Sequence, residues 1–138
     1  MNPLVIDAST TLGFLLKDEK SNSSMKALKA MEQSDRTYVP AHWWLETANG
    51  LLMAERRRRV SQAEIAEALQ LLRDLPLITD DETAQRSGSE TMALARQYAL
   101  TSYDAAYLEL AIRRKAQLMT TDGALAAAAT NAGVSILS

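Results

Sequence analysis

The chain has 138 residues, of which 47% are hydrophobic and 23% are charged, and its formal net charge is −2. This length is typical of one compact domain, so we expect a single domain over residues 1–138. The charge argues against a protein that coats nucleic acid in bulk, and the lack of cysteine excludes disulfides, thiol nucleophiles and thiolate metal sites.

The first residues lack the pattern of an export signal. They carry no basic start, and Asp7 falls where a signal peptide would keep its apolar run. No segment approaches the roughly 20 apolar residues that cross a bilayer. We therefore expect a cytoplasmic protein that has no membrane contact.

The N-terminal segment predicts a strand followed by two helices. The apolar run 4–6 indicates a buried strand that ends at Asp7. Leucines on one side of 8–16 indicate the first helix. After a polar loop, apolar residues recur every three positions over 24–33, which favours a second, amphipathic helix.

The middle of the chain repeats this alternation. Residues 37–39 are rich in β-forming side chains and stop at a proline, which indicates a second strand. A long helical stretch follows over 41–58. Ser61 opens another helix, because Glu64 three residues later completes a capping box. Residues 77–79 predict the third strand.

The C-terminal third contains helical patterns separated by short apolar runs. A helix with a weak middle at 87–89 follows the third strand, and another helix covers about 103–115. The remaining elements alternate in type, and Gly133 is a fitting stop for the last helix: a strand at 118–120, an alanine-rich helix at 123–132 and a strand at 134–137.

Strands that alternate with helices predict an α/β fold with a parallel sheet and right-handed crossovers. Five strands are expected in this sheet, with helices on its faces. In such sheets ligands bind at the carboxyl ends of the strands. The residues at those ends are therefore the first candidates for a functional site.

Four acidic residues are expected at this edge. Asp7 ends the first strand and Asp122 follows the fourth, while Glu46 and Asp104 come from helices that start there. Close carboxylates repel each other by about 4 kcal/mol per pair at 4 Å and an effective dielectric constant near 20. A divalent cation removes that penalty. The four acids therefore indicate a metal-dependent enzyme that acts on phosphates.

Each aspartate also has a purely structural explanation. Asp7 and Asp122 precede predicted helices and can cap them, and Asp104 lies three residues after Thr101 in a first helical turn, where negative charge is favoured. Glu46 resists this explanation, because it lies inside a helix with Asn49 one turn further on. The joint pattern is more informative than any single acid.

At these residues the chain resembles the PIN-domain nucleases, and more closely the VapC-type toxins of bacterial toxin–antitoxin pairs. The resemblance covers nearly the whole chain and is carried by four motifs: Val5-Ile6-Asp7-Ala8-Ser9, Pro40 followed by Glu46-Thr47-Ala48-Asn49, Thr101 to Leu108, and Thr120 to Leu125. The third motif, around Tyr103-Asp104, is the most specific of the four.

The resemblance implies a PIN-like domain with a five-stranded parallel sheet that cleaves RNA endonucleolytically with Mg²⁺ or Mn²⁺. By position, Asp7, Glu46, Asp104 and Asp122 would be the catalytic and metal-binding acids. Polar neighbours would assist them: Ser9, Asn49 and Thr120. The resemblance also implies a homodimer and a small cognate antitoxin whose Arg or Lys enters the acidic pocket. Many relatives carry a further acid where Gly123 and Ala124 stand, so the number of ions stays open.

Other fold and function classes fit these motifs less well. A phospho-receiver domain needs an acidic pair after its first strand, and a haloacid-dehalogenase-type phosphatase needs Asp-x-Asp, whereas Asp7 is followed by Ala8 and Ser9. A catalytically silent PIN-like module that only binds a partner stays as the alternative. The presence of all four acids argues against it.

The remaining conspicuous residues have two interpretations each. The run 56–59 consists of four arginines that either solvate a helix end or steer RNA, and Arg113-Arg114-Lys115 also stands at a helix end. His42 is the only histidine, so a zinc site is improbable and packing is favoured. The tryptophans beside it are expected to be buried rather than to stack on bases.

Overall fold

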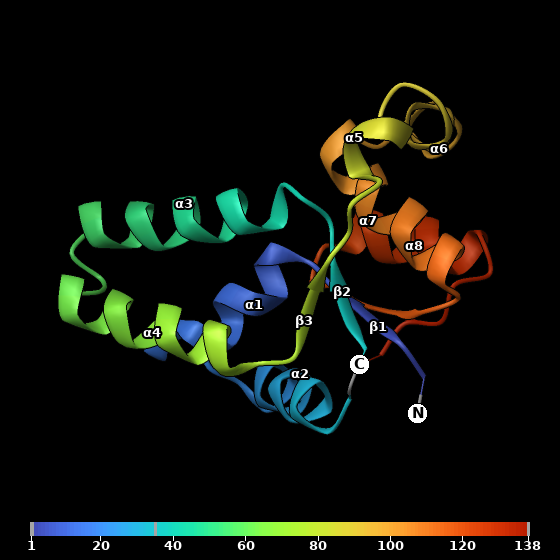
Figure 1. The fold of residues 1–138 in the computed structure, drawn as a ribbon. Coiled ribbons are helices and arrows are strands. Elements are labelled where there is room, and N and C mark those ends of the chain that lie inside the picture. Colours follow the sequence, from blue (N-terminus) through green and yellow to red (C-terminus); the bar gives the residue numbers. More distant parts are fainter. Residues whose placement is uncertain (1, 35, 138) are drawn as a thin grey trace.

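A computed structural model describes residues 2–34 and 36–137 of this α/β protein (Figure 1). Within the described residues the sheet has four parallel strands in the order β3-β2-β1-β4. Their bounds are Leu4–Ile6 for β1, Thr37–Val39 for β2, Leu77–Thr79 for β3 and Gln117–Met119 for β4. The predicted parallel sheet flanked by helices is confirmed.

The helices cover both faces of this sheet, with α1 to α4 on one side and α5 to α8 on the other (Figure 1). In chain order they are α1 Ala8–Leu15, the 3-10 turn η1 Lys17–Glu19, α2 Asn22–Gln33, α3 Trp43–Arg56, α4 Gln62–Asp74, α5 Thr83–Arg86, α6 Glu90–Tyr98, α7 Ser102–Arg114 and α8 Gly123–Asn131. The predicted weak middle at residues 87–89 is the break between α5 and α6. No helix of the described chain is long and apolar enough to span a membrane.

The predicted five-stranded sheet is wrong by one strand. Residues 134–137 do not form a full strand but touch the sheet through an isolated bridge between Leu118 and Ile136. Two hydrogen bonds hold them, from Leu118 N to Ser135 O at 2.9 Å and from Leu137 N to Leu118 O at 3.0 Å. Both bonds go to one residue of β4, so the segment meets the sheet edge at a single point.

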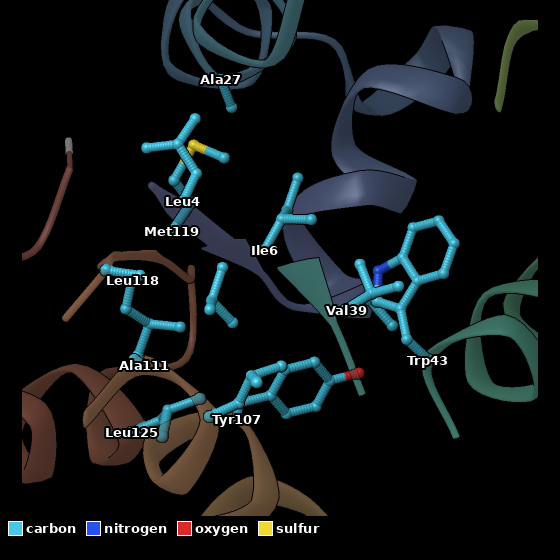
Figure 2. Packing of buried hydrophobic residues seen from close by; sticks show 14 of the residues in the cluster. Leu4, Ile6, Ala27, Val39, Trp43, Tyr107, Ala111, Leu118, Met119 and Leu125 are labelled. Carbon is cyan, nitrogen blue, oxygen red and sulfur yellow. The ribbon is translucent and has the colours of Figure 1, made fainter. Parts of the chain in front are cut away.

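The core forms around β1, whose three residues are all buried. This burial on both faces explains why β1 is an uninterrupted apolar run rather than an alternating one. Figure 2 shows Trp43 of α3 beside Val39, and Tyr107 and Leu125 of the opposite layer beneath the sheet. The Trp43 indole N–H donates to the Thr11 hydroxyl at 3.2 Å, so the tryptophan is buried without an unsatisfied donor.

A smaller apolar cluster holds the α3–α4 hairpin to the body of the protein. It consists of Leu16, Leu51, Ala54 and Ala68. Gly50 lies on the same helix as Leu51, and a Cβ atom there would stand 2.3 Å from a methyl group of Leu12. Glycine therefore lets α3 approach α1 closely in this position.

A buried ion-pair network ties the end of β3 to α7. Asp80 is only 3% exposed and accepts hydrogen bonds from both terminal nitrogens of Arg113, at 2.9 and 2.8 Å. Arg113 Nε also donates to Glu109 at 2.9 Å. Burial opposes the ionisation of Asp80, but the hydrogen bonds from Arg113 and Thr83 outweigh it and hold the pKa of Asp80 below its usual value.

We predict that Arg113→Met lowers the free energy of unfolding by about 3 kcal/mol at neutral pH. The buried carboxylates of Asp80 and Glu109 lose the guanidinium that hydrogen-bonds them and keep only the more distant Arg114, at 4.0 Å, and Arg86, at 3.9 Å. The folded-state pKa of Asp80 is depressed, so this stabilisation is present above the ordinary aspartate pKa and is lost as pH falls through the folded-state value. Chemical denaturation of both proteins at pH 7 and below pH 4 measures the difference. The double variant Asp80→Asn/Arg113→Met should recover part of the loss, and an unchanged loss would contradict the role given to Asp80.

Candidate active site

Asp7 follows β1 directly and lies at the carboxyl end of the central strand pair. It is 5% exposed, caps α1 by accepting the Thr10 amide at 2.9 Å, and accepts the Ser9 hydroxyl at 2.9 Å on the same oxygen. Its second oxygen accepts the hydroxyl of Thr120. The carboxylate is therefore held from both sides, by its own helix and by the loop after β4.

Asp122 stands at the corresponding end of the neighbouring strand. β1 and β4 are paired in register, with Ile6 opposite Met119, and Asp7 N donates to Met119 O at 3.1 Å. One oxygen of Asp122 caps α8 by accepting the amides of Ala124 at 2.9 Å and Leu125 at 3.3 Å. The parallel register therefore brings the ends of β1 and β4 to the same edge.

Glu46 reaches the same edge from α3, the helix that follows β2. The hydroxyl of Tyr107 donates to Glu46 Oε1 at 2.6 Å, and the Nε2 atom of His42 lies 3.4 Å from that oxygen. His42 Nε2 also lies 3.0 Å from the carbonyl oxygen of Tyr103. Glu46 is thus anchored to α7 through Tyr107 and to the start of its own helix through His42.

Tyr107 is itself buried, at 2% exposure, with its ring edge-on to that of His42 at a centroid distance of 5.1 Å. Burial and the hydrogen bond to Glu46 raise the pKa of the Tyr107 hydroxyl. The hydroxyl therefore stays protonated at neutral pH and acts as a donor to the carboxylate.

Asp104 lies in the first turn of α7, whose N-terminus is capped by the Thr101 hydroxyl accepting the Asp104 amide at 3.1 Å. The pKa of Asp104 is raised by burial and then by the negative charges of Asp122, Glu46 and Asp7. Asp122, Glu46 and Asp7 therefore lie near enough to Asp104 for their charges to disfavour its ionisation. The four predicted acids thus share one edge of the sheet.

The donor set of this acidic pocket, defined as Asp7, Glu46, Asp104 and Asp122, suits a hard divalent cation. All four side chains offer carboxylate oxygens, which Mg²⁺ and Mn²⁺ prefer. In the described part of the chain none of the four forms an ion pair with Lys or Arg. Their excess negative charge is compensated only by hydrogen-bond donors, and a cation would relieve it.

A second acidic group lies after β3 and was not singled out from sequence. The carboxylates of Asp80, Asp81 and Glu82 lie within 4.8 Å of one another, the only such group among residues 2–34 and 36–137. Arg113 binds Asp80, and Glu82 accepts Arg86 at 2.9 Å. Because arginines already neutralise this group, it is a structural ion-pair cluster rather than a cation site.

The polar neighbours that the sequence analysis named lie in different environments. Ser9 and Thr120 both donate to Asp7, and the Thr120 hydroxyl accepts the Asp122 amide at 3.0 Å, which links two of the acids. Thr121 was not singled out, yet it donates to Ser9 at 2.9 Å. Asn49 lies on the exposed face of α3 and, among the described residues, has no hydrogen bond to Glu46.

The two tyrosines of the α7 motif lie in different environments. Tyr107 packs in the core and reaches Glu46, whereas Tyr103 is 66% exposed. Sequence analysis did not assign Tyr107 to the site. The spacing of three residues between Asp104 and Tyr107, which places them on one helix face, is the signal that could have identified it.

A groove of about 470 Å³ adjoins the acidic pocket, with Glu46 in its wall. The rest of its lining comes from α3, its preceding residue and α7: His42, Leu45, Asn49 and Tyr103. Leu45 is 76% exposed, so a large apolar side chain and an exposed aromatic ring face solvent beside the acids. The groove offers an apolar surface next to the reactive edge.

The arginines of the two basic runs have different roles, and the division does not follow the runs. Arg59 holds Asp18 at 2.8 Å and Glu19, and Arg113 and Arg114 both approach Asp80. These arginines stabilise the fold. Arg56, Arg57 and Arg58 are exposed and, within the described chain, form no ion pair.

Comparison with known proteins agrees with this architecture. A model of the PIN domain family matches residues 4–131. A protein named ribonuclease VapC3, from Pyrobaculum aerophilum, is 28% identical over 123 residues, which is 89% of this chain and 92% of that protein.

Solved structures also resemble the chain. PAE2754 from Pyrobaculum aerophilum matches with a TM-score of 0.69 at 21% identity, over 92% of this chain and 84% of that one. FitAcB from Neisseria gonorrhoeae matches with a TM-score of 0.65 at 13% identity, over 98% and 96% of the two chains. At these identities the structures bear on the fold alone.

We predict that Asp104→Asn raises the free energy of unfolding of the metal-free protein by about 1 kcal/mol, or several degrees in Tm, because it removes one of four repelling charges. The raised folded-state pKa means that the wild type loses stability as pH rises from about 4 through that value. Thermal unfolding in EDTA at pH 7 and pH 3.5 tests this. The gain should vanish at the lower pH, and a loss of stability at pH 7 would contradict the repulsion.

Proposed function

The chain belongs to the PIN domain family, and from that membership we propose that it is a Mg²⁺- or Mn²⁺-dependent endoribonuclease, the toxin of a type II toxin–antitoxin pair. Its substrate is RNA, and its reaction is hydrolysis of a phosphodiester bond. The similarity to a protein named ribonuclease VapC3 supports this proposal. We further propose that residues 1–138 form one PIN-like domain.

The observation that carries the proposal is the electrostatics of the acidic pocket. Burial and the negative charges of the other three acids, which come from other parts of the fold, raise the pKa of Asp104, and no arginine or lysine of the described chain pairs with any of the four. A fold that needed these side chains only as helix caps would have no reason to gather them. A divalent cation that bridges RNA phosphate and protein would make use of the arrangement.

We propose that Asp7, Asp104 and Asp122 hold the cation directly or through water. Glu46 would bind a second ion or position the attacking water. A bound Mg²⁺ would polarise the phosphodiester and lower the pKa of a water molecule. The water oxygen attacks phosphorus, the bond to the 3′ oxygen breaks, and the products are a 5′-phosphate and a 3′-hydroxyl.

The chain's own residues orient these carboxylates. Ser9 and Thr120 donate to the two oxygens of Asp7 and restrict its rotation. Tyr107 restrains Glu46 by its 2.6 Å hydrogen bond, which leaves the second Glu46 oxygen free to act on water. Such partners of a ligand tune its orientation and basicity.

We also propose two protein partners. One is a small cognate antitoxin that would insert an Arg or Lys into the acidic pocket, where the four carboxylates would pair with it. The other is a second copy of this chain. Co-expression with short open reading frames adjacent to the gene, followed by size-exclusion chromatography, tests both.

The alternative is a catalytically silent PIN-like module that binds a partner and cleaves nothing. It differs from the nuclease in one measurable respect, since it would cleave no RNA either with Mg²⁺ or with a chelator. The retention of every acid of the motif favours the nuclease.

We predict that the purified protein cleaves a defined RNA pool with Mg²⁺ or Mn²⁺ and loses this activity in EDTA. Asp7→Asn and Asp104→Asn should each reduce the rate by more than about 100-fold, more than loss of an outer partner of a ligand costs. End mapping should find 5′-phosphates. Asp74→Asn is the matched control, because it removes the same charge from α4, where Asp74 accepts only Gln70.

Full Mg²⁺-dependent cleavage by Asp104→Asn would show that the acidic pocket is not the active site. Cleavage that persists in EDTA would contradict the metal dependence. Absence of cleavage by the wild type over a broad RNA pool would favour the silent module.

We predict that Tyr107→Phe lowers the cleavage rate and weakens Mn²⁺ binding by about 10- to 100-fold, because Glu46 loses the donor that fixes it. Isothermal titration with Mn²⁺ provides a measurement that is independent of activity. Tyr98→Phe removes the same atom from α6 and should change neither quantity. Equal effects of the two variants would refute the positioning role.

A further inference from the structure

The exposed face of α3 connects the groove to the tip of the α3–α4 hairpin. Leu45, Asn49, Leu52 and Arg56 follow one another at spacings of four, three and four residues, so they line one side of the helix. Each of them is exposed. From Glu46 to Arg56 the helix rises by about 15 Å.

At its first end this face meets a surface suited to a nucleobase. Tyr103 presents an exposed ring in the wall of the groove, and Leu45 presents an exposed apolar side chain in the same groove. Aromatic side chains of this kind bind single-stranded bases by stacking. The amide of Asn49 adds a donor and an acceptor to the same groove.

At the other end of the face, Arg56 and the two residues that follow it carry three positive charges that form no ion pair within the described chain. Arg59, Arg86, Arg113 and Arg114 all hold carboxylates. By contrast, Arg56, Arg57 and Arg58 pair with no acid of the described chain. Arg58 has a left-handed backbone, with φ 61°, in the turn between α3 and α4, and that turn is the far tip of the hairpin (Figure 1).

We propose that single-stranded RNA lies along this face, with one base in the groove beside Tyr103 and with backbone phosphates on Arg56, Arg57 and Arg58. The proposal rests on the nuclease function proposed above. Charge favours RNA over a peptide as the occupant, because three unpaired arginines at the end of an apolar face match a polyanion. The acidic pocket repels phosphates, so cations further along the face are needed to retain the strand.

The length of the face sets the length of RNA it can hold. A stacked strand rises about 3.4 Å per nucleotide, so 15 Å corresponds to about four to five nucleotides between the acidic pocket and the arginines. A dinucleotide substrate would therefore reach the acids and the groove but not the hairpin tip.

The test measures the affinity of a 12-nucleotide RNA for the Asp104→Asn protein in EDTA at several NaCl concentrations. Each phosphate contact contributes about 0.7 to the slope of log K against log salt for a single strand. Replacing Arg56, Arg57 and Arg58 by Gln should therefore reduce the slope by about 2. Tyr103→Ala should weaken binding by at least about five-fold with an unchanged slope, because stacking involves no counter-ion.

The matched control replaces Lys29, Arg73 and Arg96 by Gln, which removes the same charge from exposed positions on α2, α4 and α6. Its slope should stay within about 0.5 of the parent value. An equal slope change in both triple variants would overturn the proposal in favour of a general charge effect. An unchanged slope in the Arg56–Arg58 variant would overturn the proposal outright and would favour a protein as the partner of this face.

Cleavage assays in the wild-type background separate this inference from the nuclease function. With Mg²⁺, the triple Arg variant should cleave a long RNA less efficiently at low concentration but cleave a dinucleotide at the parental rate. If no RNA is cleaved by any protein while the slope still changes by about 2, the nuclease function fails and the RNA-binding face stands. If cleavage is intact and the slope is unchanged, only the inference fails.

Discussion

Mutual repulsion of four carboxylates at one edge of a parallel sheet is the constraint on which the rest of this structure depends. The strands β1 and β4 end in register and deliver Asp7 and Asp122, while α3 and α7 deliver the other two acids. Such a pocket persists only because the surrounding core is rigid and buried. The buried strand β1 and the packed tryptophan of α3 supply that rigidity (Figure 2).

The structural and functional interpretations of the acids turn out to be compatible. Asp7 and Asp122 cap their helices with one oxygen each, so the helix N-termini offset part of the negative charge. The Thr120 hydroxyl restrains the second oxygen of Asp7, and the buried Tyr107 restrains one oxygen of Glu46. The pocket therefore has a defined geometry although no arginine or lysine of the described chain pairs with its four acids.

The arginines of this protein fall into two groups: those that form ion pairs within the fold and those that are exposed and unpaired in the described chain. Where carboxylates are clustered for stability, as after β3, guanidinium groups hold them, and Arg113 links that cluster to α7. Around the acidic pocket no such pairing occurs in the described chain, although unpaired arginines stand at the tip of the neighbouring hairpin. The fold thus keeps the acidic pocket separate from the arginines of the hairpin tip. This separation suits a substrate whose phosphates contact the arginines and, through a cation, the acidic pocket.

Local patterns in the sequence determined the strands, most helix bounds, the parallel arrangement and the identity of the four acids, because apolar period, caps and strand ends are properties of neighbouring residues. They overestimated the sheet by one strand, since whether residues 134–137 pair fully depends on the edge that β4 presents. Only the tertiary structure decided that Tyr107 restrains Glu46 and that Arg59 and Arg113 are used internally. Those contacts join residues 33 to 61 positions apart, and a linear pattern carries no information about which distant partners the packing brings together.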